Sequence, residues 1–256
     1  MNVLLAIDVG NTNTMFALFD GDHMMCHWRC ATEAQRTGDE YFVWLSSLMG
    51  TVDSPSIGTV VIASVVPNVL FHLKSMCRQH YRIDPLIVGS SDCRLPVAPK
   101  VDENAHVGAD RLANATAAFT LYGGDLIVVD FGTATNFDVV DADGAYVGGA
   151  IAPGIELSVR VLHQAAAALP HVEIMCPQKA VGTNTRDCLH AGIYWGHLSM
   201  VEGICDRICT ERGCSMQTVG TGGLASLFDR ESKLFDHVNE NLTMHGLALI
   251  SQHNRE

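Results

Sequence analysis

The stretch Val3–Phe19 reads VLLAIDVGNTNTMFALF, and the rest of the chain is organised around it. An apolar run reaches Asp8, passes into the polar segment Gly10–Thr14 and is followed by a second apolar run. Two such runs on either side of a polar segment predict a buried strand, a tight turn and a returning strand. Because the turn combines a carboxylate, a glycine and short polar side chains, it suits a polyphosphate and a hydrated Mg²⁺.

The same pattern returns in Leu126–Asp138, which reads LIVVDFGTATNFD. Its segment Asp130–Thr133 aligns with Asp8–Asn11, and the separation is 130 − 8 = 122 residues in a chain of 256. Either turn alone is equally well explained as an ordinary hairpin turn, in which asparagine and glycine are common. Two such turns at corresponding places predict an internal duplication, with one phosphate-facing turn in each half.

Composition and charge narrow the class of protein. The formal net charge of −12 argues against general nucleic-acid binding, because a phosphate backbone needs clustered Lys and Arg. Asp8 interrupts the first apolar run too early for a signal peptide, and no segment approaches the roughly 20 apolar residues of a membrane span. Nine scattered cysteines without a CxxC pair favour a reducing, cytoplasmic compartment. Cys205 and Cys209 have the spacing of one buried helical face, which we favour over a zinc site.

The order of predicted elements is similar in the two halves. Each half reads as strand, hairpin, helix, strand and helix, which predicts α/β domains with mixed sheets. We place the boundary in the helix that follows Gly108, giving domains 1–116 and 117–256, with the ligand site in the cleft between them. The predicted helices are Gly38–Leu48, Pro67–Tyr81, Gly108–Tyr122, Gly154–Leu169, Thr185–Glu211, Gly223–Phe228 and Leu242–Gln252.

The segment Gly108–Arg111 opens one of these helices and carries the first candidate for proton transfer. Asp110 could simply balance the positive end of the helix dipole, with Arg111 in a salt bridge. Alternatively, Asp110 could orient an attacking hydroxyl and accept its proton late in a loose phosphoryl-transfer step. Residue spacing alone leaves both interpretations open.

Three further glycine-containing segments are candidates for contact with a ligand. Gly148–Gly154 ends a strand, where glycines permit close backbone approach. Gly182–Thr185 leads into the long helix, and Thr185 could cap that helix or help to receive an anion. Gly220–Gly223 is a weaker candidate that could approach a nucleotide base. A plain turn or cap explains each of them comparably well.

Taken together and in this order, the motifs DVGNTNT, GADR, DFGTATNFD, GGAIAPG, GTNT and TGG resemble those of the type III pantothenate kinases. They extend from Asp8 to Gly223, over most of the chain. The resemblance implies two duplicated ribonuclease H-like domains of the actin-like ATPase superfamily, which includes acetate and sugar kinases and Hsc70. It also implies that ATP phosphorylates the 4′-hydroxyl of pantothenate, in the first step of coenzyme A biosynthesis, in a cytoplasmic homodimer.

The resemblance also implies roles for particular residues. Asp110 would be the catalytic proton acceptor, and Asp130 would bind a monovalent cation, K⁺ or NH₄⁺. Pantothenate would contact Gly108, Ala109, Asp110, Arg111 and Thr185. ATP, together with Mg²⁺ near Asp8, would contact Asp8, Val9, Gly10, Asn11, Thr12, Asn13, Thr14, Met15 and Thr133.

Three positions depart from the family's pattern. Many members carry Tyr-x-x-Pro shortly before GxDR, whereas Val101–Asn104 occupies that place here. Thr183 stands where lysine is common, and Asn136 stands where threonine is frequent. The first change bears on the pantothenate pocket, while Asp8, Asp110 and Asp130 are all retained.

Two alternative functions remain open at this point. One is another small-molecule kinase or a polyphosphate phosphatase of the same superfamily, which would share the two turns but not the GADR motif. The other is a non-catalytic, regulatory relative. The retention of the three aspartates argues against the second, and the negative net charge makes direct binding to DNA by such a regulator unfavourable.

Overall fold

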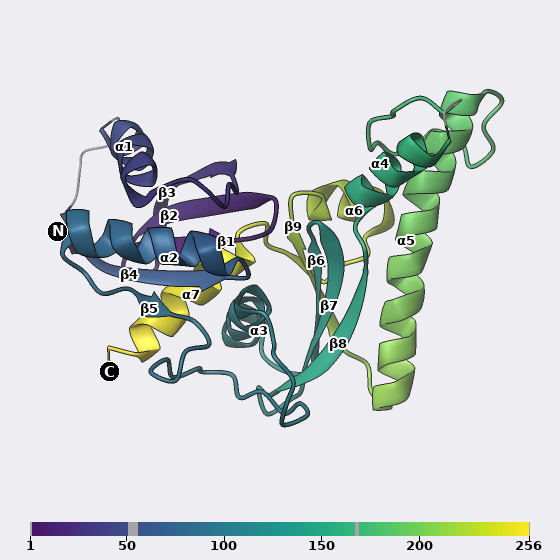
Figure 1. The fold of residues 1–256 in the computed structure, drawn as a ribbon. Coiled ribbons are helices and arrows are strands. Elements are labelled where there is room, and N and C mark those ends of the chain that lie inside the picture. The colour runs from purple at the N-terminus through teal and green to yellow at the C-terminus, as the bar shows by residue number, and fades with distance from the viewer. Residues whose placement is uncertain (1, 51–55, 167–168, 256) are drawn as a thin grey trace. The chain divides into compact units, whose positions relative to one another are not determined.

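The first of two similar sheets is built from the N-terminal strands. The computed structural model describes residues 2–50, 56–166 and 169–255. Strands β1 (Asn2–Val9), β2 (Asn13–Asp20), β3 (His23–Ala31), β4 (Ser56–Ser64) and β5 (Leu86–Ile87) are arranged in the order β3-β2-β1-β4-β5. β1, β2 and β3 are joined by antiparallel pairing, whereas β4 and β5 add in parallel (Figure 1).

The second sheet repeats this topology. Strands β6 (Leu126–Phe131), β7 (Ala134–Val140), β8 (Tyr146–Pro153), β9 (Gln217–Gly222) and β10 (His237–Val238) are arranged in the order β10-β9-β6-β7-β8. Again three antiparallel strands are followed by two parallel ones. The prediction of two α/β domains with mixed sheets is therefore confirmed. Strand β10 was missed, because two residues show no periodicity that a sequence can reveal.

Both faces of the first sheet are covered by helices. Successive residues of β1 point to opposite faces, so Leu5 and Ile7 enter one core while Leu4 and Ala6 enter another. The first core is closed by α1 (Gly38–Met49) and α2 (Pro67–Met76), and the second by α3 (Ala109–Tyr122) and α7 (Leu242–His253) (Figure 1). The predicted helix over Pro67–Tyr81 exists, but its last turn, Cys77–Tyr81, is a π-helix.

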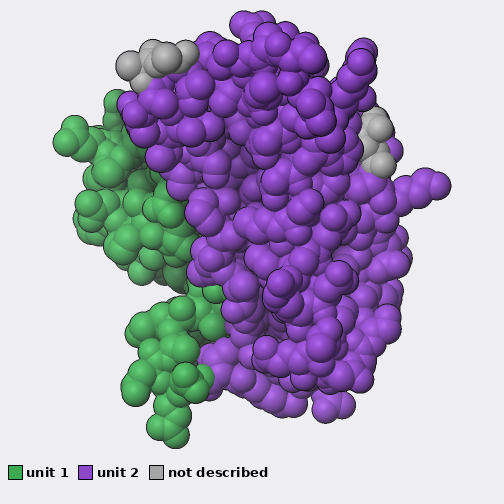
Figure 2. Space-filling model, turned by 90° about the vertical axis from the view of Figure 1, so that its right-hand side faces the viewer, with its two compact units in different colours: residues 1–98, 102–120, 242–256 green, residues 99–101, 121–241 purple. Residues whose placement is uncertain are grey.

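Helix α7 returns from the end of the chain to the first sheet. Met244, Leu247 and Ile250 are buried there, and Gly246 lies so close to Ala113 that a Cβ would strike its backbone. The chain accordingly divides into one compact unit of residues 1–98, 102–120 and 242–256 and another of residues 99–101 and 121–241 (Figure 2). Our sequence-based bounds, 1–116 and 117–256, differ chiefly in assigning this last helix to the second domain.

The second sheet packs against helices that include the longest one in the described chain. α4 (Ile155–Ala165), α5 (Thr185–Arg212) and α6 (Ala225–Ser232) contribute Ile155, Tyr194 and Phe228 to a core with Val129 and Phe137 of the sheet. α4 is shorter than the predicted Gly154–Leu169, whose residues 167–168 lie outside the described ranges. In those ranges, no helix combines the length and apolarity needed to cross a membrane.

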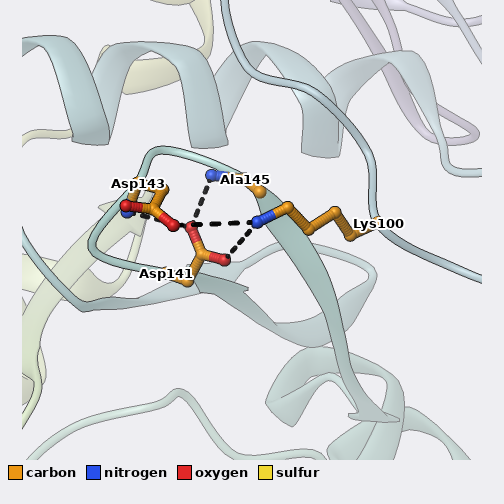
Figure 3. A network of polar contacts seen from close by, with 4 residues as sticks. All are labelled: Lys100, Asp141, Asp143 and Ala145. Carbon is orange, nitrogen blue, oxygen red and sulfur yellow. Dashed lines mark hydrogen bonds and ion pairs between the residues drawn. The ribbon is translucent and has the colours of Figure 1, made fainter.

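The hairpin between β7 and β8 illustrates how the predicted turns are held. Asp141 Oδ1 accepts hydrogen bonds from the amides of Asp143 (3.1 Å) and Ala145 (2.8 Å), and Gly144 adopts a positive φ of 81°. Lys100 Nζ lies 3.1 Å from Asp141 Oδ2 (Figure 3). Burial acts to raise the pKa of Asp141, but these amides and Lys100 outweigh it and lower the pKa.

Candidate active site

The first turn is a compact loop between paired strands. Val9 lies opposite Thr14 in the β1–β2 ladder, and the Gly10 amide donates to the Asn13 carbonyl at 3.0 Å. The side chains of Asn11, Thr12 and Asn13 are exposed, whereas Thr14 is completely buried. The loop therefore presents three short polar side chains to solvent.

The second turn has the same plan with one residue fewer. Phe131 lies opposite Thr135, and the Gly132 amide donates to the Ala134 carbonyl at 3.0 Å. Thr133 is exposed at the tip. The Gly154 amide donates to the Thr133 carbonyl at 3.2 Å, and a Cβ on Gly154 would collide with the carbonyl oxygens of Gly132 and Thr133. The glycine-rich end of β8 is thus a backbone support for this turn.

A residue that the sequence analysis missed fastens the first turn from the neighbouring strand. Thr32 follows the end of β3, and its hydroxyl donates to the Gly10 carbonyl at 2.8 Å. The same hydroxyl lies 2.9 Å from that of Thr14, and the Thr32 amide donates to the Thr12 carbonyl at 2.9 Å. The residues next to Thr32 in the sequence do not predict these contacts, because its partners lie 18 to 22 positions earlier in the chain.

A histidine missed by the sequence analysis supports the second turn. His197 of α5 places Nε2 3.1 Å from Thr135 Oγ1, and the two groups share a hydrogen bond. Its ring packs against Phe131 and Phe228, with centroids 6.0 Å and 5.5 Å away. Burial lowers the pKa of His197 to about 4, so the imidazole is neutral near pH 7.

Asp8 and Asp130 occupy corresponding positions, each two residues before the glycine of its turn. Both carboxylates are half-buried. The backbone of Gly222, which has a φ of 85°, lies close to the end of β6. A Cβ on Gly222 would lie 2.5 Å from the Phe131 carbonyl oxygen and 2.9 Å from Asp130 Oδ1. Asp130 Oδ1 and the Phe131 carbonyl oxygen are hard donors of the kind that K⁺ or Mg²⁺ accepts.

Within the described residues, no three His, Cys, Asp or Glu side chains form a cluster of metal-binding type. A single aspartate is nevertheless compatible with Mg²⁺, which commonly takes one or two carboxylates together with substrate phosphates. Cys205 lies on the buried face of α5, and burial raises the pKa of its thiol to about 12.

Asp110 lies in the first turn of α3, where the sequence placed it. The amide of Arg111 donates to its Oδ1 at 2.9 Å, and the Leu112 amide donates to the Gly108 carbonyl at 3.1 Å. A Cβ on Gly108 would overlap Asp110 Oδ1, so glycine is needed for the carboxylate to fold back over the start of the helix. Ala109 is buried, while Asp110 and Arg111 are half-buried.

The segment Gly182–Thr185 leads into α5 as predicted, but Thr185 does not cap the helix. The N-cap is Asn184, whose side chain accepts from the Asp187 amide at 3.0 Å, and Thr185 is already the first helical residue. An N-cap needs an extended backbone, which Asn184 has with φ −143° and ψ 166°. Thr185 is exposed, so its hydroxyl faces solvent at the helix start.

The predicted site residues are thus distributed over both units. Asp8–Met15 and Gly108–Arg111 belong to the first unit, while Asp130, Thr133 and Thr185 belong to the second. Val101–Asn104 is a bend and turn in which the Ala105 amide donates to the Asp102 carbonyl at 2.8 Å.

Comparison with known proteins identifies the family. A sequence model of the type III pantothenate kinases matches residues 4–207. The type III pantothenate kinase of Cereibacter sphaeroides is 56% identical over 255 residues, which is 99% of each chain. That of Paracoccus denitrificans is 52% identical over 255 residues, covering 99% of this chain and 98% of the relative. The chain belongs to the type III pantothenate kinase family. The resemblance predicted from the motifs is confirmed.

Solved structures show how widely the fold is shared. A protein described as a Baf family transcriptional activator from Campylobacter jejuni aligns with a TM-score of 0.60 and 17% identity, over 98% of each chain. The (R)-2-hydroxyglutaryl-CoA dehydratase component A of Acidaminococcus fermentans aligns with a TM-score of 0.58 and 13% identity, over the full length of both. At such identities the likeness concerns the fold alone, which is that of the actin-like ATPases and sugar kinases.

Proposed function

We propose that this protein transfers the γ-phosphoryl group of ATP to the 4′-hydroxyl of pantothenate, forming 4′-phosphopantothenate and ADP in the first step of coenzyme A biosynthesis. Membership of the type III pantothenate kinase family over nearly the whole chain carries this proposal. It is supported by the two duplicated turns and by Asp110 at the start of α3, each with the local geometry described above.

In the proposed reaction the 4′-oxygen attacks the γ-phosphorus while the bond to the β,γ-bridging oxygen breaks. The alcohol proton passes to Asp110, and ADP leaves with the bridging oxygen. A carboxylate cannot deprotonate an alcohol in the ground state, so Asp110 orients the hydroxyl first and takes the proton late. The hydrogen bond from the Arg111 amide to Oδ1 holds the carboxylate in one orientation for this task.

The two turns would hold the ATP. Exposed Asn11, Thr12 and Asn13 in the first and Thr133 in the second offer amides and hydroxyls to phosphate oxygens. The remaining residues form the base of the first turn: Asp8 pairs with Met15 and Val9 with Thr14, and the Gly10 amide donates to the Asn13 carbonyl. Mg²⁺, when bound near Asp8, would neutralise charge that develops on the transferred phosphoryl group.

Asp130 is proposed to bind the monovalent cation, K⁺ or NH₄⁺. The carboxylate and the nearby Phe131 carbonyl, both approached closely by Gly222, are hard oxygen donors suited to such an ion. Neither turn contains the lysine of a P-loop, so a cation at this place would supply positive charge to the site.

Pantothenate is proposed to contact Gly108–Arg111 and Thr185. The guanidinium of Arg111 and the exposed hydroxyl of Thr185 are suited to the carboxylate and polar groups of this substrate. Val101–Asn104 supplies neither the tyrosine nor the proline of the usual pocket. We therefore expect weaker binding of pantothenate than in relatives that carry both residues, measurable as a higher KM.

We further propose that the protein acts as a cytoplasmic homodimer. All nine cysteines, each within the described ranges, are unbridged, which fits a reducing compartment. α5 buries Tyr194, Leu198 and Val201 on one side and leaves other faces for a second subunit. Light scattering coupled to size-exclusion chromatography tests the dimer, and a mass corresponding to one chain would contradict it.

The function is tested by incubating the protein with ATP, Mg²⁺, K⁺ and pantothenate and following both ADP and phosphopantothenate. Parallel reactions contain a hexose or N-acetylmannosamine in place of pantothenate, and a separate reaction with polyphosphate and no ATP follows the release of phosphate. Turnover only with pantothenate is expected, and turnover only with another acceptor would favour the superfamily alternative. Replacement of K⁺ by Na⁺ should lower the rate, whereas an unchanged rate would contradict a cation at Asp130.

The proposed role of Asp110 is tested by Asp110→Asn, which keeps the shape of the side chain but removes its ability to accept a proton. We expect kcat to fall by at least about 100-fold, the usual contribution of a general base, while ATP binding measured by calorimetry persists. Asp39→Asn, at an exposed aspartate in the first turn of α1, is the matched control and should keep the parental rate. An active Asp110→Asn variant would show that Asp110 is not the proton acceptor.

A further inference from the structure

Thr32 is the point at which the first turn is tied to the adjoining strand. Three of the turn's groups converge on this one residue: the Gly10 carbonyl, the Thr12 carbonyl and the Thr14 hydroxyl. The three distances, 2.8, 2.9 and 2.9 Å, are all those of normal hydrogen bonds. Thr32 belongs to the first unit, as the turn does, so these contacts lie within one compact body.

The protons in this cluster can be assigned by counting. A carbonyl oxygen only accepts, so the single hydroxyl proton of Thr32 is committed to Gly10. The bond between the two hydroxyls must therefore use the proton of Thr14, which makes Thr14 the donor and Thr32 the acceptor. Because Thr14 is fully buried and its only proton is used, its side chain has no donor left for a phosphate oxygen.

The same contacts set the direction of two backbone amides. In a planar trans peptide unit the N–H points opposite to the preceding C=O. Since the Gly10 and Thr12 carbonyls both point to Thr32, the amides of Asn11 and Asn13 are directed to the side away from Thr32. Two such amides on one side of a glycine-containing turn make a concavity that favours an anion.

We propose that Thr32 is a positioning residue that orients the Asn11 and Asn13 amides toward the ATP phosphates, and that Thr14 acts through Thr32 without touching the phosphates through its side chain. This inference rests on the proposed function, because it assigns the first turn to ATP. Phosphoryl transfer depends chiefly on positioning, so a small rotation of these peptide units should reduce the rate.

Thr32→Val tests this proposal, because valine matches threonine in shape, lacks the hydroxyl and keeps the backbone amide. We expect KM for ATP to rise and kcat/KM for ATP to fall by about 10- to 100-fold, with KM for pantothenate changed much less. Thr32→Ser retains the hydroxyl and should restore most of the activity. Thr120→Val, at an exposed helical threonine, is the matched control. A Thr32→Val variant with the parental KM for ATP would overturn the proposal.

Thr14→Val separates an indirect role from direct contact. It removes the donor to Thr32 but leaves the bond from Thr32 to Gly10, so its effect on KM for ATP should be smaller than that of Thr32→Val. The double variant should resemble Thr32→Val, because both residues act through one network. A larger loss in Thr14→Val, or losses that add, would show that Thr14 itself contacts ATP. If Thr32→Val does not fold, Thr32→Ala, which also lacks the hydroxyl, takes its place in both comparisons.

Calorimetric titration with ADP and Mg²⁺ keeps the inference separate from the proposed function. If the parental protein does not phosphorylate pantothenate, the proposed function fails, yet nucleotide affinity still reports on the turn. A weaker affinity in Thr32→Val than in the parental protein and Thr32→Ser supports the positioning role. Equal affinities in all three would overturn it, whatever the acceptor substrate is.

Discussion

The two turns share a plan but are supported in different ways. Thr14 and Thr135 occupy corresponding positions, each opposite the residue between the aspartate and the glycine, and both are fully buried. The Thr14 hydroxyl shares a hydrogen bond with the hydroxyl of Thr32, which follows β3. The Thr135 hydroxyl shares one with the imidazole of His197 from α5. A duplicated framework therefore keeps the buried hydroxyl and changes its partner, because the elements around each turn differ.

The backbone supports differ as well. The second turn is met by Gly154, whose position leaves no room for a Cβ, whereas a Cβ on Gly10 in the first turn would approach only the Asn13 carbonyl, at 3.2 Å. Thr32 and Gly154 each donate a backbone amide to their turn, but only Thr32 adds a side-chain hydrogen bond, and only Gly154 packs so closely that a Cβ would not fit. This difference predicts which substitutions each turn tolerates.

The largest effect is expected from Gly154→Ala. The added methyl group would strike two carbonyl oxygens of the second turn, and backbone atoms cannot rotate away as side chains can. We expect a loss of about 3 kcal/mol or more in unfolding free energy, measured from urea unfolding. Gly10→Ala, at a turn glycine whose Cβ would approach only the Asn13 carbonyl, serves for comparison and should lose much less. Equal losses at both glycines would contradict the difference in backbone support.

A pH-dependent effect of similar size is expected from His197 alone. Its pKa is lowered to about 4 by burial, against 6.5 for an ordinary imidazole. As the pH falls from about 6.5 to 4, the unfolded chain binds a proton that the folded chain does not, so this contribution to stability is progressively lost. The complete loss is on the order of 3 kcal/mol. Above about pH 6.5 the imidazole is neutral in both the folded and the unfolded chain, so His197 adds no pH dependence to the stability there.

Urea unfolding at pH 7 and pH 5 measures this contribution. His197→Gln removes the titrating group, so its stability should fall less between the two pH values than that of the parental protein. His23→Gln, at an exposed histidine in β3 of the other sheet, should keep the parental dependence. The prediction fails if His197→Gln loses as much stability as the parental protein.

A smaller effect is expected from breaking the hydrogen bond between His197 and Thr135. His197→Leu leaves the buried Thr135 hydroxyl without this partner, at a cost of roughly 1–3 kcal/mol. Adding Thr135→Val removes the stranded hydroxyl and should recover part of the loss. Unfolding free energies of the two single variants and the double variant measure the coupling. Strictly additive losses would show that the two side chains do not depend on each other.

Much of the fold could be read from local sequence patterns. The alternation of apolar residues around Asp8 and Asp130 indicated strands, and the glycines and prolines near Gly50, Pro67 and Gly123 marked helix ends. Asp110 was placed at the start of a helix, where it lies. These features depend on neighbours within a few residues, so a single sequence contains the signals that determine them.

Other features could not be predicted because they depend on residues far apart in the chain. The cap of α5 was assigned to Thr185 rather than Asn184, an error of one residue at an element boundary. Strand β10 exists only because β9 is there to pair with it. The return of α7 to the first sheet depends on an apolar face that α3 and β1 provide more than 100 residues earlier.

The amino-acid sequence by itself determined the duplicated strand–turn–strand units, the three aspartates and the family, because these are encoded in short, ordered motifs. Only the tertiary structure decided that Thr32 holds the first turn and His197 the second. A buried hydroxyl must find a hydrogen-bond partner, but which partner it finds depends on the element that folding brings beside it. The partner lies 18 residues away in the sequence for Thr14 and 62 residues away for Thr135.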